Sequence, residues 1–136
     1  MATSLDFARE LIAAGDRDLV ILRKNAPDPE IATEVLGFHS QQAVEKYIKA
    51  VLATRGVEFR KIHDIKTLVD IAADAAIEVP SGDELEALTP FAVEFRYHTL
   101  PRGSSPIGRE RMVVLAVEVR DWADGEVLKA RNRAAE

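Results

Sequence analysis

The stretch of sequence that decides the fold is residues 38–52, FHSQQAVEKYIKAVL. At about 100° per residue, its apolar side chains and Leu36 fall on one broad face of a helix. Its polar side chains gather on the opposite side: His39, Gln42, Lys46 and Lys49. We predict a helix that starts at Asp28 and Pro29, an N-cap followed by a first-turn proline, and that ends where Gly56 can adopt a left-handed cap.

The same periodicity continues on both sides of this stretch. Residues 4–25 are predicted to form a first helix, with apolar residues at steps of three and four: Leu5, Ala8, Ile12, Gly15, Leu19 and Leu22. Pro27 follows this helix and ends it, because proline cannot continue the hydrogen-bond ladder. A third helix is predicted to begin at Asp64, acting as its N-cap, and its apolar stripe runs to Ala76.

Two further helices are predicted towards the C-terminus. Ser81 and Glu84 have capping-box spacing and precede a fourth helix over residues 85–95, which Pro90 must kink or split. After a loop, a fifth helix is predicted to begin at Ser105. Its apolar stripe includes Trp122, which we expect in the core or in a dimer interface.

The composition indicates one compact domain over residues 1–136. No run approaches 18 apolar residues, and the N-terminus has no secretory signal, so we expect a cytoplasmic protein without a membrane partner. The chain has no cysteine, and its net charge of −5 argues against a general nucleic-acid coat. Helices joined by short connections predict an all-α, up-and-down helical bundle of about five helices.

Residues 38–52 resemble the His-x-x-Gln-Gln-Ala-x-Glu-Lys helix of the HEPN family (higher eukaryotes and prokaryotes nucleotide-binding). Residues 55–56 resemble its Arg-Gly turn, and residues 63–68 its His-Asp-Leu-like helix start. Residues 92–97, AVEFRY, resemble its Tyr-Ala-Val-Glu-x-Arg-Tyr ending, with Phe91 in place of the first tyrosine. In this order the motifs make a specific signal across about four-fifths of the chain.

The resemblance implies a compact helical bundle that forms a homodimer. It also implies a frequent partner, a minimal nucleotidyltransferase, in toxin–antitoxin-like pairs of bacteria and archaea. Some members of the family are metal-independent ribonucleases. They carry an arginine separated from a histidine by four to six residues, and their composite site forms across the dimer.

This sequence departs from the ribonuclease spacing. Its three histidines are His39, His63 and His98. Before His63, Arg60 leaves a gap of two residues and Arg55 a gap of seven. Before His98, Arg96 leaves a gap of one, and no histidine follows Arg131. We therefore assign no catalytic residue with the family's motif.

Two groups of residues are candidates for binding. The first is the polar stripe of the central helix: His39, Gln42 and Lys46. It is either a solvated face or a surface that contacts a subunit or holds an anionic ligand through donated hydrogen bonds.

The second group is a loop with three cationic or titratable residues: Arg96, His98 and Arg102. These residues precede a predicted helix N-terminus, where a phosphate could bind. The alternative is a solvated loop whose arginines pair with carboxylates. His98 could also act as a general acid or base in RNA cleavage.

His63 and Asp64 also have two interpretations. Either Asp64 orients the His63 imidazole for chemistry, or Asp64 caps the third helix and His63 packs over the cap or bonds a backbone carbonyl. We favour the structural interpretation, because adjacent residues at a helix start do not usually face each other. The histidine spacing gives no signal for a metal site, and we predict no cofactor.

The sequence thus predicts a non-catalytic binding and interaction module of HEPN type. The predicted partners are a second copy, a minimal nucleotidyltransferase and a nucleotide or other phosphate-bearing ligand. One alternative is a metal-independent ribonuclease that acts on RNA through Arg96 and His98. Another is a purely structural dimer.

Overall fold

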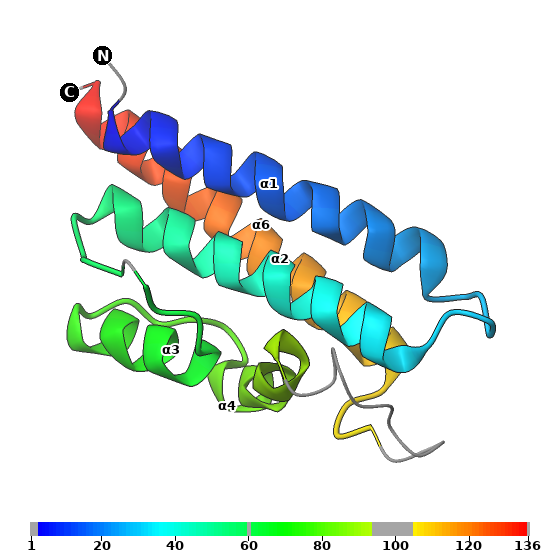
Figure 1. Cartoon of the computed structure of the whole chain (residues 1–136). Coiled ribbons are helices and arrows are strands. Elements are labelled where there is room, and N and C mark those ends of the chain that lie inside the picture. The colour runs from blue at the N-terminus through cyan, green and yellow to red at the C-terminus, as the bar shows by residue number, and fades with distance from the viewer. Residues whose placement is uncertain (1–2, 60, 94–104, 136) are drawn as a thin grey trace.

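The computed structural model describes residues 3–59, 61–93 and 105–135, and all regular structure within them is helical. Three long helices lie side by side: α1 (Ser4–Asn25), α2 (Thr33–Thr54) and α6 (Arg109–Ala134). A shorter layer covers α2 on another side: α3 (Ile65–Asp74), α4 (Gly82–Leu85) and a 3-10 helix, η1 (Glu86–Ala92). The all-α bundle predicted from the sequence is confirmed (Figure 1).

The centre of the bundle is α2, which contacts α1, α6, α3 and η1. Its buried side chains include Tyr47, Ile48 and Leu52. Neighbouring helices approach closely where α2 and α1 carry glycine. A Cβ atom on Gly37 would lie 2.2 Å from Cδ1 of the buried Phe91 ring, so only glycine fits there. No helix of the described residues is long and apolar enough to cross a membrane.

The start of α2 differs from the prediction. Asp28 does not cap a helix; its Oδ1 accepts a hydrogen bond from the Glu30 backbone N–H at 2.9 Å, within a turn. The Arg109 guanidinium donates to the carbonyl oxygens of Ala26, Asp28 and Ile31 at 2.6–3.2 Å. Because Arg109 satisfies these carbonyls, the turn is stable, and α2 begins at Thr33.

The capping box predicted at Ser81 and Glu84 is also wrong. Ser81 has a φ of 56° and makes no side-chain cap; its hydroxyl donates to Glu118 Oε1 on α6 at 2.9 Å. The fourth helix is split as expected, but after Leu85. Beyond that residue the chain forms the 3-10 helix η1, which contains Pro90.

The last helix begins at Arg109, four residues after its predicted start at Ser105. The Ser105 hydroxyl donates to the Ile107 carbonyl at 2.6 Å, which makes a turn, and Gly108 is the N-cap of α6. Trp122 is partly buried against the core, as one of its two interpretations predicted.

Candidate functional site

The first and last residues of the candidate polar stripe form a cluster across the α1–α2 contact. His39 Nδ1 lies 3.0 Å from Asp18 Oδ1, and Lys46 Nζ donates to Asp18 Oδ2. A carboxylate only accepts hydrogen bonds, so Nδ1 of His39 carries a proton here. We call these three residues the Asp18 cluster.

The Asp18 cluster consists of a buried carboxylate and two half-buried partners. The Asp18 side chain is 12% exposed, that of His39 20% and that of Lys46 27%. The helical repeat explains the arrangement, because residues seven apart on α2 lie on the same face. That face is therefore not a solvated one: it meets α1, and one shared carboxylate orients both of its cationic or titratable groups.

Gln42, the third residue of the stripe, belongs to a different set of contacts. Its amide donates to Gln41 Oε1 at 2.7 Å. The Gln41 amide in turn donates to Glu45 Oε1 at 3.0 Å and to the His63 carbonyl at 3.3 Å. The structure thus brings His39 and Lys46 together, whereas Gln42 extends a network along α2.

The centre of that network is the Glu45 carboxylate, whose side chain is only 7% exposed. Its Oε2 accepts from Lys49 Nζ at 3.1 Å and lies 3.2 Å from His63 Nδ1. We call Gln41, Glu45, Lys49 and His63 the Glu45 cluster. His63 is 68% exposed, so a buried carboxylate orients an imidazole at the surface. That arrangement can position a proton donor or acceptor.

Asp64 caps α3, as predicted. Its Oδ1 accepts from the Lys66 backbone N–H at 3.2 Å, and its Oδ2 accepts from the Thr67 hydroxyl at 2.8 Å. Burial alone would raise the pKa of Asp64, but hydrogen bonds from Thr67, Thr89 and Lys66 outweigh it and lower that pKa. The carboxylate beside His63 is therefore Glu45 and not Asp64.

The remaining sequence-predicted candidates cannot be placed. Arg96, His98 and Arg102 lie outside the residues that the structure describes. Within the described ranges, no group of three or more histidine, aspartate or glutamate residues is positioned to hold a metal ion.

Sequence reasoning missed the two carboxylates that organise these clusters, Asp18 and Glu45. Asp18 lies three residues after Gly15 and four before Leu22, at the edge of the apolar stripe of α1. An acidic residue at such an edge signals a buried partner. Glu45 lies four residues before Lys49, a spacing that brings the two side chains together on a helix.

Comparison with known proteins gives two matches. The model of the HEPN domain family matches residues 5–126. A crystal structure of an archaeal HEPN homologue is similar, with a TM-score of 0.60 and 21% sequence identity. The similarity covers 93% of this chain and 99% of the archaeal chain, and at that identity it concerns the fold. The comparison with curated proteins found no match.

Proposed function

This chain belongs to the HEPN domain family, and from that premise we propose that it is a non-catalytic binding and interaction module. In this proposal it forms a homodimer, pairs with a minimal nucleotidyltransferase in a toxin–antitoxin-like system, and binds a nucleotide or another phosphate-bearing molecule. The observation that carries the ligand part is the Asp18 cluster, because it holds an ammonium group and an imidazole in fixed orientations and leaves both partly exposed.

The donors of the Asp18 cluster suit a phosphate. An ammonium group has three N–H donors, and only one of the Lys46 donors is needed for Asp18. The contact of His39 with Asp18 uses Nδ1 and leaves Nε2 for another partner. A ligand phosphate that accepts from Lys46 Nζ, and from Nε2 of His39 in its imidazolium form, would be held by groups whose rotamers are already fixed, which reduces the entropic cost of binding.

The arginine–histidine spacing supports a non-catalytic role. No arginine precedes any of the three histidines of this sequence by the interval typical of the family's ribonucleases. In addition, His39 and His63 each have Nδ1 engaged by a carboxylate inside the bundle.

Titration with ATP and with inorganic phosphate, monitored by calorimetry, tests the ligand part. Lys46→Gln should weaken ATP binding about tenfold, because a charge-assisted hydrogen bond is lost. Lys66→Gln is the matched control: Lys66 lies on α3 and is 57% exposed. Equal binding by the wild type and the Lys46 variant, or equal losses in both variants, would contradict the proposed site.

Incubation of RNA with the purified protein in EDTA tests the non-catalytic part, with Arg96→Ala and His98→Ala alongside. We expect intact RNA in every sample. Cleavage that disappears in both variants would establish the ribonuclease alternative. Light scattering on the same samples tests the homodimer, and a monomer that binds no nucleotidyltransferase would contradict the interaction role.

A further inference from the structure

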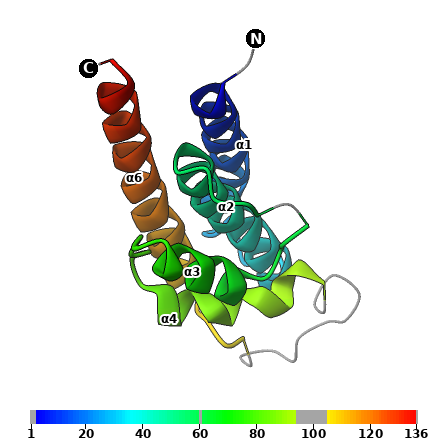
Figure 2. The same cartoon turned by 90° about the vertical axis from the view of Figure 1, so that its left-hand side faces the viewer.

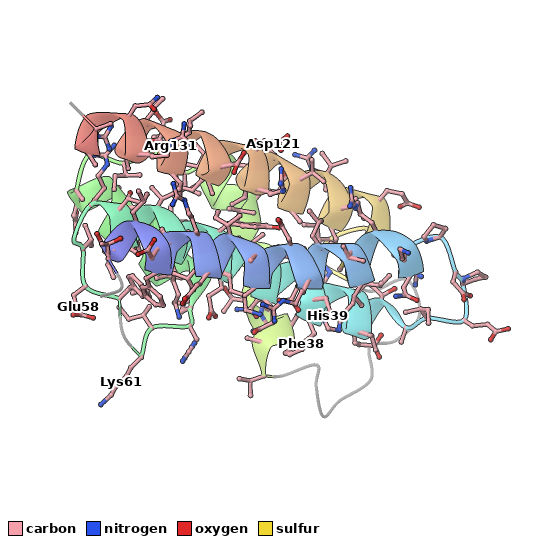
Figure 3. The ribbon with its side chains drawn as sticks, turned by 90° about the horizontal axis from the view of Figure 1, so that it is seen from above. Phe38, His39, Glu58, Lys61, Asp121 and Arg131 are labelled. Atoms are coloured by element: carbon pink, nitrogen blue, oxygen red, sulfur yellow. The ribbon has the colours of Figure 1, made fainter. Side chains whose placement is uncertain are left out.

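A groove runs between α1 and α6, on the side of the molecule away from the Asp18 cluster. The two helices are antiparallel (Figure 1), and Figure 2 shows them apart at the end where the chain termini lie. Two hollows follow one another along this groove, with volumes of about 200 and 430 Å³. Figure 3 shows Asp121 and Arg131 on the groove side of α1, opposite Phe38 and His39.

The floor of the groove is apolar and partly exposed. Side chains of both helices line it: Ile12, Leu19 and Val20 from α1, and Val117, Val127 and Leu128 from α6. Val20 is 41% exposed and Leu128 is 49% exposed. A third helix laid along this floor would bury both side chains and would complete a four-helix arrangement with α2 on the far side.

The rims of the groove carry charges in a fixed order. Arg9 and Arg131 flank the first hollow, at the end near the termini. Asp121 and Asp124 lie towards the middle. Arg23 lies at the other end of the second hollow. The order along the groove is therefore positive, negative, positive, and the 14 residue steps from Arg9 to Arg23 span about 21 Å of helix.

Asp16 and Arg120 are the remaining charged residues of the groove, and Arg120 also donates from Nη1 to Asp121 Oδ1 at 3.4 Å. Arg120 Nε donates to Asp16 Oδ1 at 3.0 Å, and the same oxygen accepts from the Tyr47 hydroxyl at 2.7 Å. Burial, the hydrogen bond to Asp16 and its negative charge raise the pKa of Tyr47, so its hydroxyl stays protonated. These contacts tie α1, α2 and α6 together at mid-groove, where three carboxylates, those of Asp16, Asp121 and Asp124, outnumber the one guanidinium of Arg120, so the middle of the groove stays negative.

The order of charges along the groove favours one class of binding partner over two others. A symmetric pair of copies joined through this groove would place like charges opposite each other, because a positive–negative–positive pattern is unchanged by reversal. A nucleic-acid backbone would bring phosphates against Asp121 and Asp124. A helix whose charges run negative, positive, negative would place an opposite charge at each of the three regions of the rims. Its apolar side chains would also cover the apolar floor of the groove.

We infer that the α1–α6 groove docks one amphipathic helix of a different protein, whose face carries acidic, basic and acidic residues about seven positions apart around an apolar seam. This surface is distinct from the Asp18 cluster, so the inference stands or falls separately from the ligand part of the proposed function.

The test uses the full chain and two synthetic 22-residue helical peptides with leucine seams. One carries Glu, Lys and Glu at seven-residue intervals, and the other carries Lys, Glu and Lys at the same positions. Fluorescence anisotropy should give a dissociation constant about tenfold lower for the first peptide than for its charge-reversed twin. Equal binding of both peptides, or binding of neither, would overturn the inference.

A double variant, Arg9→Glu with Arg131→Glu, should weaken binding of the first peptide at least about tenfold. The control, Arg17→Glu with Arg133→Glu, makes the same change of net charge on exposed sites of the same helices and should bind like the wild type. Equal effects of the two double variants would overturn the inference. So would self-association, or binding of a 20-nucleotide RNA, that is abolished by the groove variant alone.

Discussion

The two helices α2 and α6 are similar in length but differ in how the bundle uses them. More than half of the residues of α2 are buried, and these include four polar ones: Ser40, Gln41, Glu45 and Lys49. Fewer than a quarter of the residues of α6 are buried, and all of these are apolar. The central helix thus places polar groups inside the fold, whereas α6 keeps them on its outer faces.

This difference changes how a polar motif should be interpreted. On α2, each candidate side chain already has an intramolecular partner: Asp18 for His39 and Lys46, and Gln41 for Gln42. A substitution there alters folding as well as binding. On α6, a side chain such as Arg131 lines a hollow, so its loss should change a binding event and leave stability nearly intact.

Glycine substitutions test the comparison most strongly. Gly37→Ala on α2 should lower the free energy of unfolding by about 3 kcal/mol, because the new Cβ would meet the buried Phe91 ring in a space with no room to adjust. Gly125→Ala on α6 should raise it by roughly 0.5–1 kcal/mol, because a Cβ there meets nothing within 4 Å and alanine favours the helix.

Urea unfolding followed by circular dichroism measures both values. The opposite signs are the essential result, since both substitutions add the same methyl group to a helix interior. If Gly37→Ala stabilised the protein, as Gly125→Ala is expected to, the Phe91 ring of η1 could not lie as close to Gly37 of α2 as the structure places it.

Carboxylate substitutions give the next largest contrast. Asp18→Ala should lower the free energy of unfolding by about 2 kcal/mol, because it leaves the half-buried His39 and Lys46 without their acceptor. Asp121→Ala should change stability by less than about 0.5 kcal/mol, because its side chain is 67% exposed and its contact with Arg120 is long, at 3.4 Å. Thermal unfolding of the two variants at one salt concentration measures the difference.

Raising the salt concentration sharpens the Asp18 result. Exposed ion pairs weaken with salt, whereas partly buried ones are screened much less. The cost of Asp18→Ala should therefore persist at 0.5 M NaCl. A cost that vanished under those conditions would show that the Asp18 cluster behaves as a surface pair.

The sequence predicts the parts of this fold whose determinants are local. The bounds of α1 agree with the prediction at both ends, and Asp64 caps α3. Gly56, with a φ of 67°, follows the end of α2 as expected. In each case a few neighbouring residues suffice, because caps, proline and glycine act within one turn.

The sequence does not predict features that depend on distant residues. The start of α2 is set by Arg109, which lies about 80 positions from the carbonyls that it binds. The candidate site was recognised only as a stripe on one helix, because Asp18 comes from another helix and completes it only in the folded chain. Helical periodicity assigns residues to faces, but it does not identify the partner that each face meets.

The smallest predicted effect concerns an exposed pair on the outer side of α6. The Arg111 guanidinium donates two hydrogen bonds to the Glu84 carboxylate, both at 2.6 Å, and these bonds lower the pKa of Glu84. A carboxylate with a lowered folded-state pKa stabilises the fold above its unfolded pKa, and that contribution is lost as the pH falls through the folded value. Arg111→Ala should therefore move the pKa of Glu84 back up, as measured by NMR titration, while the unfolding midpoint at pH 7 stays nearly constant because both side chains are exposed. A large loss of stability in this variant would mean that the outer face of α6 holds the fold together much as α2 does, and the contrast between the two helices would fail.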